Sequence, residues 1–206
     1  MYARAKFLKS AASLSQLPPD EGYEVAFAGR SNAGKSTALN MLTRQKGLAR
    51  TSKTPGRTQL INLFALDDTR RLVDLPGYGY AKVPLDVKER WQETLGEYLH
   101  DRKCLRGIVL LMDARHPFKD MDQRMIDWAI ASHLKCHLLL SKADKLTHQE
   151  RLLTLRQATE AIAEVSDFVS VQLFSALKRE GLETLIAHMD AWYDLTPPPS
   201  SHEQED

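Results

Sequence analysis

The sequence has only two cysteines and no long apolar run. Cys104 and Cys136 belong to no C-x-x-C pair and to no Cys/His spacing of a metal site, so we expect reduced core thiols in a cytoplasmic protein. No apolar stretch approaches the length of a membrane-spanning helix. These absences argue against a disulfide framework and a transmembrane segment.

Net charge is also nearly absent, because the 206 residues carry a formal charge of +1. The charge of the whole chain therefore points to no partner. Between residues 30 and 71, however, nine basic residues stand against two acidic ones, a local excess of +7. Such a basic stretch is typical of a protein surface that binds a polyanion, and equally of an ordinary solvent-exposed surface.

The length predicts one main domain, and no internal repeat is visible. Residues 1–22 are interpreted as an N-terminal arm that ends in Pro18-Pro19-Asp20, and residues 23–193 as the domain itself. Residues 194–206 contain Pro197-Pro198-Pro199 and an acidic end, a composition that predicts a disordered tail.

Apolar patterning predicts strands and helices that alternate along the chain. The expected strands are Glu24–Ala28, Gln59–Leu66, Arg71–Leu75, Gly107–Met112, Cys136–Leu140 and Phe168–Phe174. The expected helices are Thr37–Arg44, Asp86–Arg102, 120–132, 149–164 and a last one through Leu182 and Trp192. This order predicts an α/β fold with a doubly wound, mostly parallel six-stranded sheet and helices on both faces. The hairpin over 59–75 supplies one antiparallel edge strand.

A G-x-x-x-x-G-K-[ST] pattern follows the first predicted strand and precedes the first helix. Its residues, with the next one, are Gly29, Arg30, Ser31, Asn32, Ala33, Gly34, Lys35, Ser36 and Thr37. In this context the pattern predicts a phosphate-binding loop, because its main-chain N–H groups and the helix start can surround phosphate oxygens. Lys35 would neutralise the β- and γ-phosphates, and the Ser36 hydroxyl would bind Mg²⁺.

Two further motifs lie at the ends of later strands. Asp74-Leu75-Pro76-Gly77 has the D-x-x-G pattern: Asp74 can hold the Mg²⁺ shell, and the N–H of Gly77 can reach a γ-phosphate.

The other motif would select the base. It comprises Ser141, Lys142, Ala143 and Asp144, followed later by Phe174, Ser175 and Ala176. The Asp144 carboxylate can accept hydrogen bonds from both N1–H and the 2-amino group of guanine, which adenine cannot offer. Ser141 replaces the usual Asn or Thr of N/T-K-x-D, but it can still hydrogen-bond to the phosphate loop.

Together with Ser52-Lys53-Thr54-Pro55-Gly56-Arg57-Thr58 and Asp113-Ala114-Arg115-His116-Pro117, these motifs closely resemble the EngB (YihA/YsxC) family of bacterial Era-like GTPases. The resemblance covers about Leu17 to Trp192. It implies a Ras-like P-loop GTPase (G) domain over 23–193, a role in assembly of the large ribosomal subunit with rRNA as a partner, and a link to cell division and septation. We expect a monomer that binds GTP and GDP, and neither DNA nor a membrane.

The resemblance also implies a switch loop before the hairpin. Its expected nucleotide contacts are Gly56, Arg57, Thr58, Gln59 and Leu60. Thr58 resembles the switch residue that closes on Mg²⁺ and the γ-phosphate, and Thr54 is the alternative. The expected Mg²⁺ ligands are then Ser36, Thr58 and Asp74.

The catalytic machinery predicted in this way comprises Lys35, Thr58, Gly77 and Asn32. Tyr78 stands where Ras-type proteins place a water-orienting Gln, so the intrinsic hydrolysis rate should be low. Asn32 resembles a K⁺ ligand of related GTPases, with K⁺ in the place of an arginine finger. Arg30, Arg57 and Arg115 are alternative fingers within the chain.

Two other function classes remain open at this point. The chain could be an RNA- or ribosome-binding scaffold for which GTP is a structural ligand. An ATP-dependent enzyme is the other class, and Asp144 argues against it.

Overall fold

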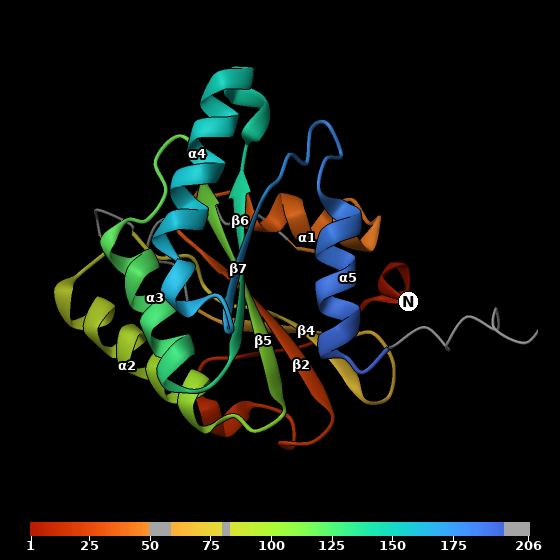
Figure 1. The fold of residues 1–206 in the computed structure, drawn as a ribbon. Helices are drawn as coiled ribbons and strands as arrows, with labels where there is room; N and C mark the ends of the chain where they lie inside the picture. Colours follow the sequence, from red (N-terminus) through yellow and green to blue (C-terminus); the bar gives the residue numbers. More distant parts are fainter. Residues whose placement is uncertain (50–58, 80–82, 196–206) are drawn as a thin grey trace, which may run out of the picture.

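A computed structural model describes residues 1–49, 59–79 and 83–195, which form a single twisted sheet with helices on both sides (Figure 1). The strands are β1 (Lys6–Ala11), β2 (Tyr23–Gly29), β3 (Ile61–Ala65), β4 (Arg70–Asp74), β5 (Leu105–Asp113), β6 (Lys135–Ser141) and β7 (Val169–Leu173). The helices are α1 (Lys35–Thr43), α2 (Leu85–Asp101), α3 (Asp120–Ala131), α4 (His148–Ala161) and α5 (Leu182–Trp192). None of the helices in these ranges is long and apolar enough to cross a membrane.

The strands lie in the order β1-β3-β4-β2-β5-β6-β7. β2 pairs in parallel with β4 and β5, and β5, β6 and β7 continue the parallel arrangement. β3 is antiparallel to both of its neighbours, β1 and β4. The predicted α/β architecture and the predicted hairpin are therefore confirmed.

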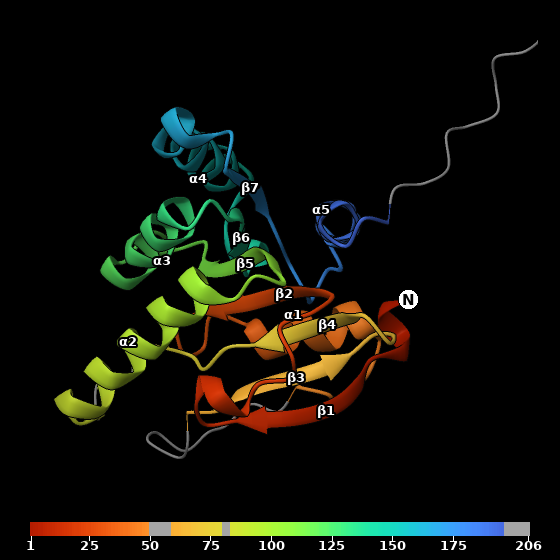
Figure 2. The same cartoon turned by 90° about the horizontal axis from the view of Figure 1, so that it is seen from below.

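The described residues form a sheet of seven strands, so the predicted number of six is wrong. The additional strand is β1, which lies within residues 1–22, the segment interpreted as an N-terminal arm (Figure 2). The antiparallel strand β3 is consequently not an edge strand. Of the six residues of β1 only Ala11 is buried, and the register shifts between Phe7 and Lys9. A strand with a bulge and without an alternating apolar face has no period-two pattern from which it could be predicted.

Alternate side chains of the central strands point to opposite faces, which gives two cores. Ala26 and Ala28 of β2 belong to the core that α2, α3 and α4 cover, whereas Val25 and Phe27 belong to the core under α1 and α5. Figure 1 shows the two helix groups on the two sides of the sheet. α2 buries Trp91, Leu95, Tyr98 and Leu99 against the first of these cores.

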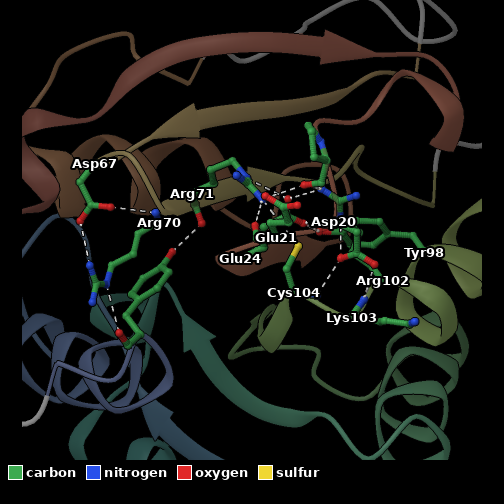
Figure 3. A network of polar contacts seen from close by, with 12 residues as sticks. Asp20, Glu21, Glu24, Asp67, Arg70, Arg71, Tyr98, Arg102, Lys103 and Cys104 are labelled. Carbon is green, nitrogen blue, oxygen red and sulfur yellow. Dashed lines mark hydrogen bonds and ion pairs between the residues drawn. The ribbon is translucent and has the colours of Figure 1, made fainter.

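A buried carboxylate joins the amino-terminal ends of β2 and β4 to the carboxyl-terminal end of α2. The Glu24 side chain has no exposed surface, and it accepts hydrogen bonds from Arg71 Nε at 3.0 Å and Arg102 Nη2 at 2.7 Å. Arg102 Nε donates a third bond at 3.1 Å, and Tyr98 Oη donates a fourth at 3.0 Å. Figure 3 shows these side chains converging on Glu24 from β4 and α2. Burial by itself would raise the pKa of Glu24, but hydrogen bonds and charges from Arg102 and Arg71 hold it below its usual value.

We expect the substitution Glu24→Gln to destabilise the protein by about 3 kcal/mol, because it leaves the Arg71 and Arg102 guanidinium groups without their buried counter-charge. The midpoint and slope of urea unfolding measure this change. Glu97→Gln is the matched control on exposed surface of α2, with an expected effect below about 0.5 kcal/mol. Equal stabilities of the two variants would show that the ion network contributes nothing specific.

Candidate nucleotide-binding site

The phosphate-loop pattern forms the connection between the central strand β2 and helix α1. β2 ends at Gly29 and α1 begins at Lys35, so Lys35 and Ser36 stand in the first turn of the helix, two residues earlier than predicted. Asn32 and Gly34 adopt left-handed conformations, with φ of +64° and +93°. At Gly29 a Cβ atom would lie 2.9 Å from the Leu111 carbonyl oxygen, so only glycine fits there.

The loop presents a set of unpaired main-chain donors. Among the described residues, no protein acceptor receives a hydrogen bond from the N–H groups of Asn32, Gly34, Lys35, Ser36 or Thr37. The first N–H groups of a helix lack partners by geometry, and left-handed residues turn the preceding amides in the same direction. A row of unpaired N–H donors suits the negatively charged oxygens of a nucleotide's phosphate groups.

Side chains and main-chain groups from other loops hold the phosphate loop in place. Ser141 Oγ donates to the Ala33 carbonyl oxygen at 2.6 Å, and Lys142 Nζ donates to that of Asn32 at 2.6 Å. The Ser31 N–H donates to the Tyr78 carbonyl oxygen at 2.7 Å. The predicted hydrogen bond between Ser141 and the phosphate loop is therefore confirmed, despite the shorter side chain.

Lys35 and Asp74 form an ion pair beside this loop, and both side chains are largely buried. Asp74 ends β4, next to the phosphate loop that follows the neighbouring strand β2. The Ser36 hydroxyl and the Asp74 carboxylate are oxygen donors of the kind that Mg²⁺ prefers when it takes its other ligands from phosphate and water. These residues therefore fit the ion that the motif implies.

The two base-recognition motifs meet at the end of β6 and β7. Ser175 Oγ donates to Asp144 Oδ1 at 2.6 Å, and the Ala143 N–H donates to the Phe174 carbonyl oxygen at 3.1 Å. The hydrogen bond from Ser175 is the main reason that the pKa of Asp144 lies below its usual value. Asp144 is thus held as a carboxylate, and Ser175 fixes one of its two oxygens.

Asp113 is a site residue to which the sequence assigned no role. It ends β5 and lies between Arg115, at 2.8 Å, and Lys142, at 3.3 Å. The hydrogen bond from Arg115 is the main cause that lowers the pKa of Asp113. Arg115, one of the alternative arginine fingers, is therefore engaged by Asp113, which also pairs with the Lys142 ammonium group.

Tyr78 is buried and packs away from solvent. Its hydroxyl donates to the carboxylate of Asp122, which has no exposed surface and lies in the first turn of α3. Burial raises the pKa of Tyr78. Sequence reasoning missed Asp122, and its only local signal is its place in the capping box of α3, where it accepts from the Lys119 N–H at 3.0 Å.

The remaining predicted switch residues Thr54, Gly56, Arg57 and Thr58 lie outside the described residues. Gln59 and Leu60 precede β3 and are half-buried. Gly77 packs against the phosphate loop, since a Cβ there would lie 3.4 Å from the Ser31 nitrogen.

Comparison with known proteins identifies the family. A family model described as "50S ribosome-binding GTPase" matches residues 24–142. A probable GTP-binding protein EngB of Shewanella amazonensis is 58% identical over 93% of this chain and 90% of its own length. A relative with the same description from Idiomarina loihiensis is 59% identical over 93% of each chain. The chain belongs to the EngB family of GTP-binding proteins.

Solved structures confirm the Ras-like P-loop fold. The crystal structure of a probable GTP-binding protein engB matches with a TM-score of 0.68 and 22% identity, over 84% of this chain and 100% of the other. Era from Aquifex aeolicus bound to GDP·AlF₄⁻ matches with a TM-score of 0.63 and 19% identity, over 89% and 61%. As a member of the EngB family, the chain binds GTP and GDP and has GTPase function.

Proposed function

We propose that this chain is a GTP-dependent switch in assembly of the large ribosomal subunit, with a consequent link to normal cell division and septation. The observation that carries the nucleotide part is the row of unpaired amides in the phosphate loop, combined with an Asp144 carboxylate that Ser175 orients. The ribosomal part is supported by the description of the matching family as ribosome-binding. In this proposal the protein acts as a monomer in the cytoplasm and binds precursor rRNA.

Hydrolysis in this site requires charge neutralisation and positioning more than covalent chemistry. The phosphate-loop amides and Lys35 would bind the triphosphate, Asp144 would select guanine, and the N–H of Gly77 would orient the γ-phosphate. Mg²⁺, held by Ser36, Thr58 and Asp74, would supply charge neutralisation when bound.

A low intrinsic rate follows from the position after Gly77. The Tyr78 hydroxyl is engaged by Asp122, so it is not available to orient a water molecule. This proposal assigns the water-positioning step to a contribution from a K⁺ ion or from a partner. The competing scaffold function, with GTP as a structural ligand, would need no such contribution.

The Asp144→Asn variant should bind GTP about a hundredfold more weakly and should gain relative preference for xanthosine triphosphate, because an amide cannot accept both guanine donors. Competition against a fluorescent guanine nucleotide measures both affinities. Asp127→Asn, on the exposed surface of α3, is the control and should behave as wild type. An unchanged nucleotide preference of Asp144→Asn would refute the assigned base pocket.

A pull-down of large-subunit precursors with the purified protein tests the ribosomal role. We expect more association with a non-hydrolysable GTP analogue than with GDP or without nucleotide, because contacts of the γ-phosphate with Thr58 and Gly77 would fix the arrangement in which the basic side of residues 30–71 meets rRNA. Rising salt should weaken the association steeply if that segment contacts rRNA. Association that ignores both nucleotide and salt would favour the scaffold function.

GTP turnover should be faster in K⁺ than in Na⁺ at equal ionic strength if Asn32 is a K⁺ ligand. The Asn32 side chain is exposed and makes no hydrogen bond within the described chain, which leaves its oxygen available. Asn32→Gly keeps the left-handed backbone accessible and removes the amide, so the ratio of the rates in K⁺ and Na⁺ should fall to about one. Equal wild-type rates in the two salts would remove K⁺ from the mechanism.

A further inference from the structure

Two carboxylates follow the neighbouring strands β5 and β6, and only one of them holds cations. Asp113 ends β5 beside Ser141, the last residue of β6, and Asp144 lies three residues further along the chain. Asp113 Oδ2 lies 2.8 Å from Arg115 Nη2 and 3.3 Å from Lys142 Nζ. No ion pair within the described residues involves Asp144. Two cations next to the base-recognition segment are therefore bound by the carboxylate that is not assigned to guanine.

The contact between Arg115 and Asp113 has the geometry with which a carboxylate would bind guanine. Arg115 Nε donates to Asp113 Oδ1 at 3.0 Å, and Arg115 Nη2 donates to Oδ2 at 2.8 Å. A guanidinium group thus offers a carboxylate two parallel N–H donors, as N1–H and the 2-amino group of guanine do. Arg115 therefore carries a chemical equivalent of the edge of guanine that Asp144 would recognise.

The charge of Asp144 already acts on Arg115. The hydrogen bond to Asp113 is the main cause that raises the pKa of Arg115, and the negative charge of Asp144 adds to it. The Arg115 side chain is 43% exposed, so solvent leaves it room to change its rotamer. Lys145 and Lys178 also act on Asp144 by their charge, but an ammonium group lacks the planar pair of donors. Arg115 is consequently the neighbouring cation that can imitate the base.

We propose that Asp113 is a positioning residue for guanine recognition that acts through Arg115. By binding the guanidinium group with both of its oxygens, Asp113 keeps it away from Asp144, whose carboxylate is then free for N1–H and the 2-amino group of guanine. The ion pair with Lys142 acts in the same sense, since it keeps that ammonium group where Nζ donates to the Asn32 carbonyl oxygen of the phosphate loop. This inference rests on the proposed assignment of Asp144 to the base.

The experiment compares GDP with inosine diphosphate, which lacks the 2-amino group. The full-length protein with Mg²⁺ is titrated in competition with a fluorescent guanine nucleotide, and the ratio of the two Kd values measures recognition of that group. The wild type should bind GDP about tenfold more tightly than inosine diphosphate, because the 2-amino group donates to a charged acceptor. A general defect of the fold would weaken both nucleotides alike and leave the ratio unchanged.

Asp113→Asn should raise the Kd for GDP about tenfold and the Kd for inosine diphosphate less, so that the ratio falls toward one. The amide keeps an oxygen for the Arg115 backbone N–H, which donates to Oδ1 at 3.0 Å, but it removes the counter-charge of the guanidinium group. Adding Arg115→Gln to this variant should restore the ratio, because the competing group is then absent. Arg115→Gln alone should keep the wild-type ratio.

Asp67→Asn is the matched control. Asp67 lies in the hairpin between β3 and β4, and it also accepts hydrogen bonds from an arginine side chain and from backbone N–H groups, those of Thr69 and Arg70. The control should leave both Kd values unchanged. The role of Asp113 is overturned if Asp113→Asn keeps the ratio, if added Arg115→Gln does not restore it, or if Asp67→Asn lowers it equally.

The Asp144→Asn variant in the same assay separates this inference from the proposed base pocket. Weaker GDP binding by Asp144→Asn, together with an unchanged ratio for Asp113→Asn, would refute the role of Asp113 and leave the base pocket standing. Unchanged GDP binding by Asp144→Asn would refute both.

Discussion

The candidate site depends on one constraint: the backbone between Gly29 and Lys35 must turn its N–H groups outward in the same direction. This turn requires left-handed conformations at Asn32 and Gly34, which an isolated loop would seldom populate together. Hydrogen bonds to the carbonyl oxygens of Asn32 and Ala33 hold the turn from behind, and they come from residues at the end of β6. The Gly34 amide is therefore preorganised, because the Ala33 carbonyl oxygen of the same peptide group already accepts a hydrogen bond from Ser141.

Such preorganisation depends on the register of the central strands. β2 carries Glu24 as its second residue and Gly29 as its last. The first end is joined to its neighbours by buried charges, whereas the last end leads into the phosphate loop. At the Glu24 end, Arg71 and Arg102 attach β4 and the end of α2 to β2 through a buried ion network. A slip of either element would leave a charge buried and unpaired, which is costly. The network thus helps to keep Asp74 and Asp113, at the carboxyl ends of β4 and β5, next to the phosphate loop.

Sequence patterns predicted the parts of this molecule in which a local rule operates. Continuous apolar runs predicted β5 and β6, and the spacing of Gly29, Gly34 and Lys35 predicted the loop between β2 and α1. Two parts could not be predicted in this way. β1 has mostly exposed side chains and a bulge, and its place in the sheet is set by antiparallel pairing with β3 rather than by an apolar pattern of its own. Asp122 contacts Tyr78 across 44 positions of sequence, and no sequence pattern around either residue predicts that contact.

The contact between Tyr78 and Asp122 also explains why Tyr78 cannot both anchor the segment after Gly77 to α3 and position a water molecule. Asp122 has no exposed surface, and burial is the main cause that raises its pKa. If the Tyr78 hydroxyl turned toward a water molecule near the phosphate loop, it would leave that buried carboxyl group with one partner fewer. Since an unsatisfied buried group costs about 1–3 kcal/mol, the arrangement favours a fixed Tyr78. The residue therefore anchors the start of this segment to α3, and the chemistry of hydrolysis has to draw on other groups.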